Sequence, residues 1–329
     1  MLTTRFTELI GCAVPIQQAG MGAAAPPELV AAVSEAGAFG MLGTARAGLN
    51  ATTFARLLEQ TRQLTTRPFG VNFIMRPGGV AAGSPREFIE QAAKVSKVVE
   101  FFYTDPSAEF VRIVHDQGAL VSWQVGSREE ALAAADIGCD LIVAQGIEAG
   151  GHVRGTIGLL SLLSEVLDAV PSVPVLAAGG IGTGRAMAAA LAAGADGVRV
   201  GTRFAASEEA GVHPTYTKAL VAARAQDSVY TRTFHVGWPE APHRALRSAI
   251  DAAEAFRGEI VGKVVGLDGT EVAVPRFGTR VPDRTATGEV AAMSLYAGES
   301  VGAVKRVLPA REVIRELVEE AEQLLRRPR

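Results

Sequence analysis

The residue best suited to chemistry in this sequence is His152, which directly follows Gly150 and Gly151. An imidazole titrates near neutral pH, and it is the side chain most often used as a general base or as a hydrogen-bond donor to a reacting group. Two preceding glycines allow the backbone of such a loop to approach a bound molecule closely. We therefore predict that His152 is a catalytic residue.

The other histidines carry weaker signals. His213 precedes Pro214 at a predicted helix start and is in a position to border the site, whereas His235 and His243 are interpreted as surface or subdomain contacts. No His-Glu-x-x-His pattern or carboxylate cluster indicates a bound metal. No Gly-x-Ser-x-Gly element indicates a serine hydrolase. We expect no metal ion in the site.

Eight short apolar runs alternate with alanine-rich helical stretches along the first two hundred residues. Continuously apolar runs are typical of strands buried on both faces. Eight such strands with helices between them favour a closed (β/α)8 TIM barrel over an open doubly wound sheet. The open sheet stays an alternative, although no Gly-x-Gly-x-x-Gly pattern follows the first run. The predicted strands are 14–18, 39–42, 69–73, 98–102, 119–124, 140–145, 173–177 and 197–200.

The alternation of apolar runs and alanine-rich stretches ends at about residue 205. Residues 212–300 contain predicted helices at 215–225 and 243–256 together with turn-rich segments, so we predict an appended, mainly helical subdomain that covers one mouth of the barrel. The stretch 309–327 has apolar residues at helical spacing and is predicted to return to the barrel as an amphipathic helix. We therefore expect an α/β fold whose barrel domain comprises 1–211 and 301–329 and whose substrate-side subdomain comprises 212–300.

Glycines follow the last two predicted strands of the barrel. Gly179 and Gly180 come after the seventh strand, and Gly201 and Thr202 after the eighth. Loops at these two places commonly hold a phosphate group in TIM barrels. Because glycine has no Cβ, backbone N–H groups can close on phosphate oxygens, and the Thr202 hydroxyl can donate a further hydrogen bond. The alternative is that these glycines only make tight turns.

Three neutral amides stand where buried strands end, at Asn72, Gln124 and Gln145. Each amide offers both a donor and an acceptor, which suits a flat heterocycle edged with N–H and C=O groups. An isoalloxazine ring is such a heterocycle. The alternative is that each amide satisfies the backbone of a loop.

Composition and charge disfavour several classes of function. Hydrophobic residues make up 48% of the chain and charged residues 20%, as in ordinary globular proteins, and the net charge of −3 provides no positive field for nucleic acids or anionic lipids. Cys12 and Cys139 lack the spacing of a disulfide framework or a thiolate metal site. No apolar run reaches the roughly 20 residues of a membrane helix, and no secretory signal is evident. We expect a soluble, cytoplasmic protein.

Several segments of the chain resemble the nitronate monooxygenase family, formerly called 2-nitropropane dioxygenases, which are FMN-dependent barrel enzymes. The likeness covers residues 5–225 well. Its Glu-Ala-Gly-Gly-His element is fairly specific, whereas Gly-Gly-Ile and Gly-Thr-Arg-Phe are shared with other FMN barrels. The segments that carry the resemblance are 15–21, 68–72, 145–152, 177–181, 200–204 and 296–302.

The resemblance implies a bound FMN and the oxidative denitrification of alkyl nitronates, in which a nitronate and O2 give a carbonyl compound and nitrite. It implies that His152 works over the flavin, as a base toward a nitroalkane or as a charge-assisted hydrogen-bond donor to the nitro oxygens. The residues implied near the phosphate are Gly179, Gly180, Gly201 and Thr202. The residues implied near the ring are Gly20, Met21, Gly22, Asn72, Gln124, Gln145 and Gly150, and Gly151 joins this cofactor-binding set.

Related flavoproteins with other chemistry share these motifs. FMN-dependent enoyl-acyl-carrier-protein reductases and certain NADH:quinone reductases resemble the chain, but some of the latter carry Lys in place of Gln124 and Asp in place of Gln145, which favours the nitronate interpretation. NAD(P)H-dependent reduction of an enoyl thioester or a quinone is therefore the alternative function. A flavin-free barrel enzyme that acts on a sugar phosphate is the third hypothesis.

We expect small-molecule substrates and no nucleic-acid or membrane partner. A homodimer is one assembly that the sequence allows.

Overall fold

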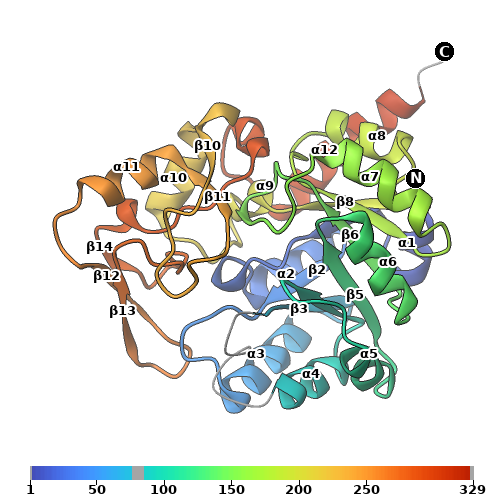
Figure 1. The fold of residues 1–329 in the computed structure, drawn as a ribbon, viewed down its shortest axis with the longest axis horizontal. Helices are drawn as coiled ribbons and strands as arrows, with labels where there is room; N and C mark the ends of the chain where they lie inside the picture. Colours follow the sequence, from blue (N-terminus) through green and yellow to red (C-terminus); the bar gives the residue numbers. More distant parts are fainter. Residues whose placement is uncertain (1, 76–84, 327–329) are drawn as a thin grey trace.

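Eight parallel strands form one sheet in the computed structural model, which describes residues 2–75 and 85–326. Their order is β1-β9-β8-β6-β5-β4-β3-β2, and β1 bridges back to Phe39, whose N–H donates to the Ile16 carbonyl at 2.9 Å. The sheet therefore closes, and the predicted TIM barrel is confirmed (Figure 1). The strands are β1 (Ile16–Gln18), β2 (Gly40–Gly43), β3 (Phe69–Ile74), β4 (Val98–Phe102), β5 (Leu120–Val125), β6 (Leu141–Gln145), β8 (Val175–Ala178) and β9 (Gly197–Val200).

Helices surround this barrel, and local signals set where they begin. Asn50 and Ser127 accept hydrogen bonds from backbone N–H groups in the first turns of α3 and α6, at 3.0 and 3.2 Å. The final helix, predicted over 309–327, is α12, and Arg327 lies outside the described residues. The helices are α1 (Arg5–Ile10), α2 (Pro27–Glu35), α3 (Ala51–Leu64), α4 (Pro85–Ala93), α5 (Ala108–His115), α6 (Arg128–Asp136), α7 (Leu159–Ala169), α8 (Gly184–Ala192), α9 (Thr202–Ala205) and α12 (Ala310–Leu325), with a 3-10 turn η1 (Gly22–Ala24).

Helix α1 seals the end of the barrel at which the strands begin. Its Phe6 and Ile10 belong to one buried cluster with inward-facing strand residues. The Arg5 guanidinium pairs with Asp196, just before β9, at 2.7 Å. Because this end is filled with apolar side chains, a ligand can enter only at the opposite end, where the strands finish. The strand residues of the cluster are Phe39, Met41, Val98, Leu141, Val143, Leu176 and Ala178.

The segment 212–300 lies beside the barrel, in yellow to orange in Figure 1. It is a mixture of helices and strands, so the expected mainly helical character is corrected. Residues 243–246 of the predicted helix form β11, because they pair with β10 on one side and with β7 (Gly151–His152) on the other. Its elements are α10 (Pro214–Ala222), η2 (Ala225–Asp227), β10 (Ser228–Thr231), β11 (His243–Leu246), α11 (Arg247–Ala255), β12 (Ile260–Val265), β13 (Glu271–Pro275), β14 (Thr287–Gly288), η3 (Val290–Ala292) and η4 (Glu299–Ala303).

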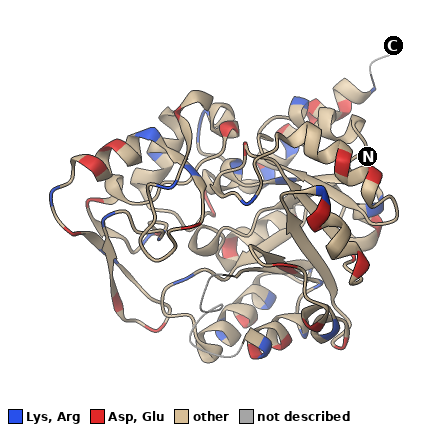
Figure 2. Ribbon diagram, viewed as in Figure 1, with Lys and Arg blue, Asp and Glu red and all other residues tan. Residues whose placement is uncertain are grey.

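Charges of both signs are interspersed over the outer helices (Figure 2). Within the described ranges, no helix is long and apolar enough to cross a membrane. Cys12 and Cys139 are free, and burial raises the pKa of each thiol to about 12. Neither is therefore a thiolate at neutral pH.

Candidate active site

One cavity opens at the ends of the barrel strands, and every site residue predicted from the sequence lines it. Since these residues come from the last residues of β3, β5 and β6 and from the segments that follow β1, β6, β8 and β9, closure of the barrel brings them together. The predicted residues are Gly20, Met21, Gly22, Asn72, Gln124, Gln145, Gly150, Gly151, His152, Gly179, Gly180, Gly201 and Thr202. The cavity is also lined by residues that the sequence analysis did not single out, among them Arg46, Ile74, Phe102, Arg199, Tyr216, Trp238 and Tyr296.

The glycines after β8 and β9 leave backbone open to the cavity. Gly179 and Gly180 have φ angles of 115° and 68°, which favour glycine. Gly201 has a φ of −110°, and a Cβ there would meet its nearest neighbours, Ala19 and Met21, only at 3.6 and 3.7 Å. A Cβ at 201 would thus make ordinary van der Waals contacts, so packing alone does not require glycine at this residue of the cavity wall.

Two other glycines are explained by contacts within the protein. A Cβ on Gly20 would overlap the side chain of Asn72, and one on Gly150 would overlap the backbone of Ala297 and Gly298. These two glycines allow the loops to pack, whether or not a cofactor is bound. The tight-turn alternative concerns the glycines after β8 and β9, and of these Gly179 and Gly180 have the positive φ angles of such turns, whereas Gly201 does not.

The amide of Gln145 is buried and only half satisfied. Its Nε2 donates to the His152 carbonyl at 3.1 Å, whereas its Oε1 has no hydrogen-bond partner. An unsatisfied buried acceptor costs about 1–3 kcal/mol. Because Gln145 lines the cavity, this oxygen suits a ligand that brings an N–H donor.

The Thr202 hydroxyl is likewise held in one role by the protein. Its oxygen accepts a hydrogen bond from the Gly298 N–H at 3.1 Å, and the side chain is buried at the cavity wall. With that lone pair occupied, its O–H remains able to donate. This donor lies next to Gly201, as expected for an anion site.

His152 is placed in part by strand pairing with a distant segment. It lies opposite His243 in the β7–β11 pair, and Arg244 donates to the Ile147 carbonyl at 2.8 Å. Its ring centre lies 4.5 Å from that of Trp238 and 5.4 Å from that of Tyr296. The segment 212–300 thus supplies both the backbone partner and the aromatic walls of the predicted catalytic imidazole.

The remaining histidines have structural contacts. His243 is fully buried beside His152, at 5.7 Å between ring centres, and burial lowers its pKa. Its Nε2 accepts from the Phe234 N–H and its Nδ1 lies 3.1 Å from the Ala241 carbonyl, so it is a neutral subdomain contact and not a surface residue. His213 caps α10 by accepting from the Thr215 N–H at 3.1 Å. His235 stacks on Phe277.

A family model described as nitronate monooxygenase matches residues 3–320 of this chain. The chain belongs to the nitronate monooxygenase family. It is accordingly an enzyme, a flavin-dependent oxidoreductase.

Relatives at about one-third identity cover most of the chain. The nitronate monooxygenase of Pseudomonas aeruginosa is 32% identical to this chain, and the match covers 97% of this chain and 99% of the relative. An oxo-octahydroindene-carboxyl-CoA dehydrogenase of Rhodococcus jostii is 36% identical over 263 residues, or 80% of this chain and 71% of the relative. The structure of FabK from Thermotoga maritima superposes with a TM-score of 0.79 at 28% identity, covering 99% of this chain and 98% of that one.

The glutamate of the family-like Glu-Ala-Gly-Gly-His element has a structural role in this family member. Both carboxylate oxygens of Glu148 accept from the Leu159 N–H, at 3.0 and 3.1 Å, at the start of α7. This contact fixes the loop between β6 and α7, on which His152 lies.

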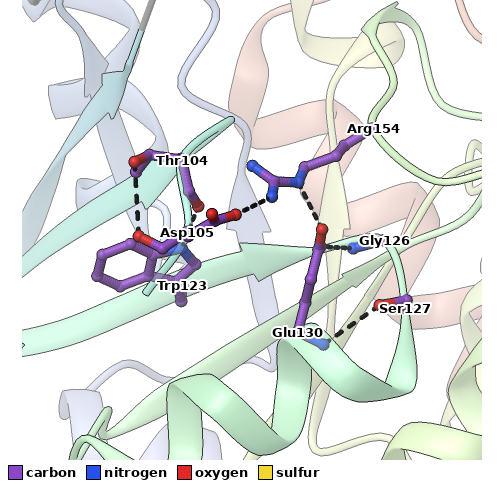
Figure 3. A network of polar contacts seen from close by, with 7 residues as sticks. All are labelled: Thr104, Asp105, Trp123, Gly126, Ser127, Glu130 and Arg154. Atoms are coloured by element: carbon purple, nitrogen blue, oxygen red, sulfur yellow. Dashed lines mark hydrogen bonds and ion pairs between the residues drawn. The ribbon is translucent and has the colours of Figure 1, made fainter. Parts of the chain in front are cut away.

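A second set of contacts holds the same loop through Arg154 (Figure 3). Arg154 donates to Glu130 and to Asp105, each at 2.5 Å, and Glu130 also accepts from the Gly126 N–H at 2.7 Å. A Cβ on Gly155 would overlap the Gly126 backbone, so the two loops are in direct contact. Arg154 thus ties the loop of His152 to the loops after β4 and β5.

The sequence analysis missed two buried charges that line or support the cavity. Glu100 interrupts the apolar β4 and Arg199 the apolar β9, and both are buried, at 0% and 6% exposure. A signal for them was available, because a charge inside a continuously apolar strand must be paired. No comparable local signal marks Tyr216, Trp238 or Tyr296, which the segment 212–300 brings to the cavity.

Replacing Glu130 by Gln should loosen the loop of His152. The change removes a partly buried, charge-assisted contact to Arg154, so we expect the free energy of unfolding to fall by about 1–2 kcal/mol. Hydrogen exchange of the amides of residues 153–156 should become faster. Asp105→Asn is the matched control, because the Asp105 side chain is 91% exposed and its ion pair should contribute little. Equal effects of the two changes on urea unfolding and exchange would contradict the assignment.

Proposed function

We propose that this protein binds FMN in the cavity and converts alkyl nitronates and O2 to carbonyl compounds and nitrite. The observation that carries the proposal is the position of His152, which lies among the predicted cofactor-binding residues in one cavity of a nitronate monooxygenase family member. The bound flavin would supply the capacity to accept electrons from the substrate and to react with O2.

The residues present fit the two ends of FMN. Gly179, Gly180, Gly201 and Thr202 would hold the phosphate, since they offer open backbone and a hydroxyl donor. At the ring end, the unpartnered Oε1 of Gln145 would accept from a ring N–H. A bound flavin would thereby satisfy a buried amide oxygen that the protein leaves without a partner.

His152 would act on the substrate rather than on the cofactor. A nitroalkane loses the proton from the carbon that bears the nitro group, and the imidazole would take it. Toward a nitronate already formed, a protonated imidazole would instead donate to the anionic nitro oxygens. The overall change balances as two nitronates and one O2 giving two carbonyl compounds and two nitrite ions.

The alternative function is NAD(P)H-dependent reduction of an enoyl thioester or a quinone. The specific support for a thioester is the 36% identical relative, which is named as a carboxyl-CoA dehydrogenase. The apolar cavity residues Ile74, Phe102 and Trp238 are compatible with an acyl group. Under this alternative, His152 would serve as a proton donor or an anchor for the thioester carbonyl.

Oxygen-free mixing distinguishes the two functions. We expect ethyl nitronate to change the visible absorbance of the bound flavin within the turnover time, because the nitronate is the electron donor. NADH and NADPH should bleach the same sample slowly or not at all. Rapid bleaching by a nicotinamide with no response to the nitronate would support the thioester or quinone function. A colourless preparation that takes up no FMN would favour the flavin-free barrel.

Replacing His152 by Asn should separate proton abstraction from substrate binding. We expect kcat/KM for neutral nitroethane to fall by about 10²–10⁴, the usual contribution of a general base, and the fall for ethyl nitronate to be much smaller. Flavin content should not change, since the Gln145 contact uses the backbone carbonyl of residue 152. Equal turnover of nitroethane by the variant and the parent enzyme would remove His152 from the chemistry.

Replacing Gly201 by Val should displace the phosphate of FMN. The φ angle of −110° is negative, and a Cβ here would be in ordinary van der Waals contact with Ala19 and Met21, so valine adds two methyl groups at a residue that lines the cavity. We expect at least a tenfold loss of FMN affinity with an unchanged melting temperature of the apoprotein. Gly201→Ala is the graded control and should lose less. A Val variant isolated with full flavin content would show that the phosphate lies elsewhere.

A further inference from the structure

A buried ion pair spans the inside of the barrel beneath the cavity. Arg199 on β9 pairs with Glu100 on β4, two strands that are not neighbours in the sheet. Ser122 also donates to Glu100, at 3.2 Å, so the carboxylate is satisfied from several sides. Removing two charges from water is costly, and such a pair is therefore weak evidence for stability and points to another role.

The carboxylate of Glu100 decides which way the amide of Asn72 faces. The Asn72 Nδ2 lies 2.8 Å from a Glu100 oxygen. An ionised carboxylate can only accept, so the amide nitrogen must face Glu100. The other end of the Asn72 amide, its Oδ1 acceptor, is left for the cavity that Asn72 lines.

The guanidinium of Arg199 fixes the orientation of the Gln124 amide, which turns its oxygen toward the charged group where Asn72 turns its nitrogen. Its Nη1 donates to the Gln124 Oε1, and its Nε donates to the Gln17 Oε1 at 2.8 Å. A guanidinium can only donate, so the amide oxygen of Gln124 must face Arg199. Gln124 is thereby left with its Nε2 donor for the cavity, whereas Gln17 does not line it.

We propose that Glu100 and Arg199 are positioning residues. They fix the orientation of the cavity-wall amides and thereby determine which of these amides presents a hydrogen-bond donor and which an acceptor. Asn72 presents an acceptor and Gln124 a donor, and Gln145 presents an acceptor because its nitrogen is held by a backbone carbonyl. The inference rests on the proposed function, in which these amides would form hydrogen bonds with the N–H and C=O groups at the edge of the FMN ring. A side-chain amide or hydroxyl in place of Glu100 or Arg199 could not impose these orientations, because such a group both donates and accepts.

The test compares two isosteric changes next to the same guanidinium. Gln124→Glu keeps an oxygen on Arg199 but replaces the N–H donor that faces the cavity by an oxygen. Gln17→Glu places the same charge on the same guanidinium outside the cavity. We expect FMN to bind apoprotein Q124E at least tenfold more weakly than the parent protein, with a shifted visible spectrum of the bound flavin. Q17E should bind within about threefold of the parent.

Fluorescence quenching of FMN measures affinity, and the melting temperature of each apoprotein checks folding. Parent-like affinity and spectrum in Q124E, or an equal loss of affinity in Q17E, would overturn the inference while the proposed function stands. Failure of the parent protein to bind FMN would overturn both. If Q124E does not fold, Q124M against Q17M repeats the comparison without added charge. Removing Arg199 itself is less informative, because the buried Glu100 carboxylate would lose its charged partner and the protein would be destabilised for that reason alone.

Discussion

Closure of the sheet between β1 and Phe39 is the constraint on which the rest of the structure depends. Without it, the loops after β1 and β2 would lie at an open edge of the sheet. With it, the strand ends form a ring, and α1 fills the opposite end with apolar side chains. Residues as distant in sequence as Gly20 and Thr202 therefore line one cavity. The same closure creates an interior in which any polar side chain must find its partners.

The catalytic proposal depends on further contacts, which are additional to those that close the barrel. His152 is held by pairing with β11, and the loop that carries it is held by the contacts of Arg154 and Glu148. Trp238 and Tyr296 enclose its ring, and both come from the segment 212–300. Under the proposed function, the wall that would hold the flavin comes from strand ends, and the wall that would meet a nitronate or a thioester comes from the segment 212–300.

Buried polar groups divide between these two walls. At the wall formed by the strand ends, Glu100 and Arg199 are paired, and they leave one end of the Asn72 and Gln124 amides unused by the protein. At the wall formed by the segment 212–300, His243 is satisfied by backbone groups and is kept neutral by burial. Polar groups in a low-dielectric interior are tolerated when they are satisfied, so an amide that lines the cavity with one end left over is informative about a ligand.

The sequence by itself determined the eight strands, the helix starts and the residues that follow each strand, because apolar runs, caps and glycines act locally. The glycines at 179, 180 and 201 and the amides at 72, 124 and 145 were predicted for this reason. Only the tertiary structure decided that residues 243–246 form a strand, since they pair with β10 and, some ninety residues away in the chain, with β7. It also decided the orientation of each amide and the aromatic enclosure of His152. These depend on hydrogen bonds and packing between segments that no local pattern relates.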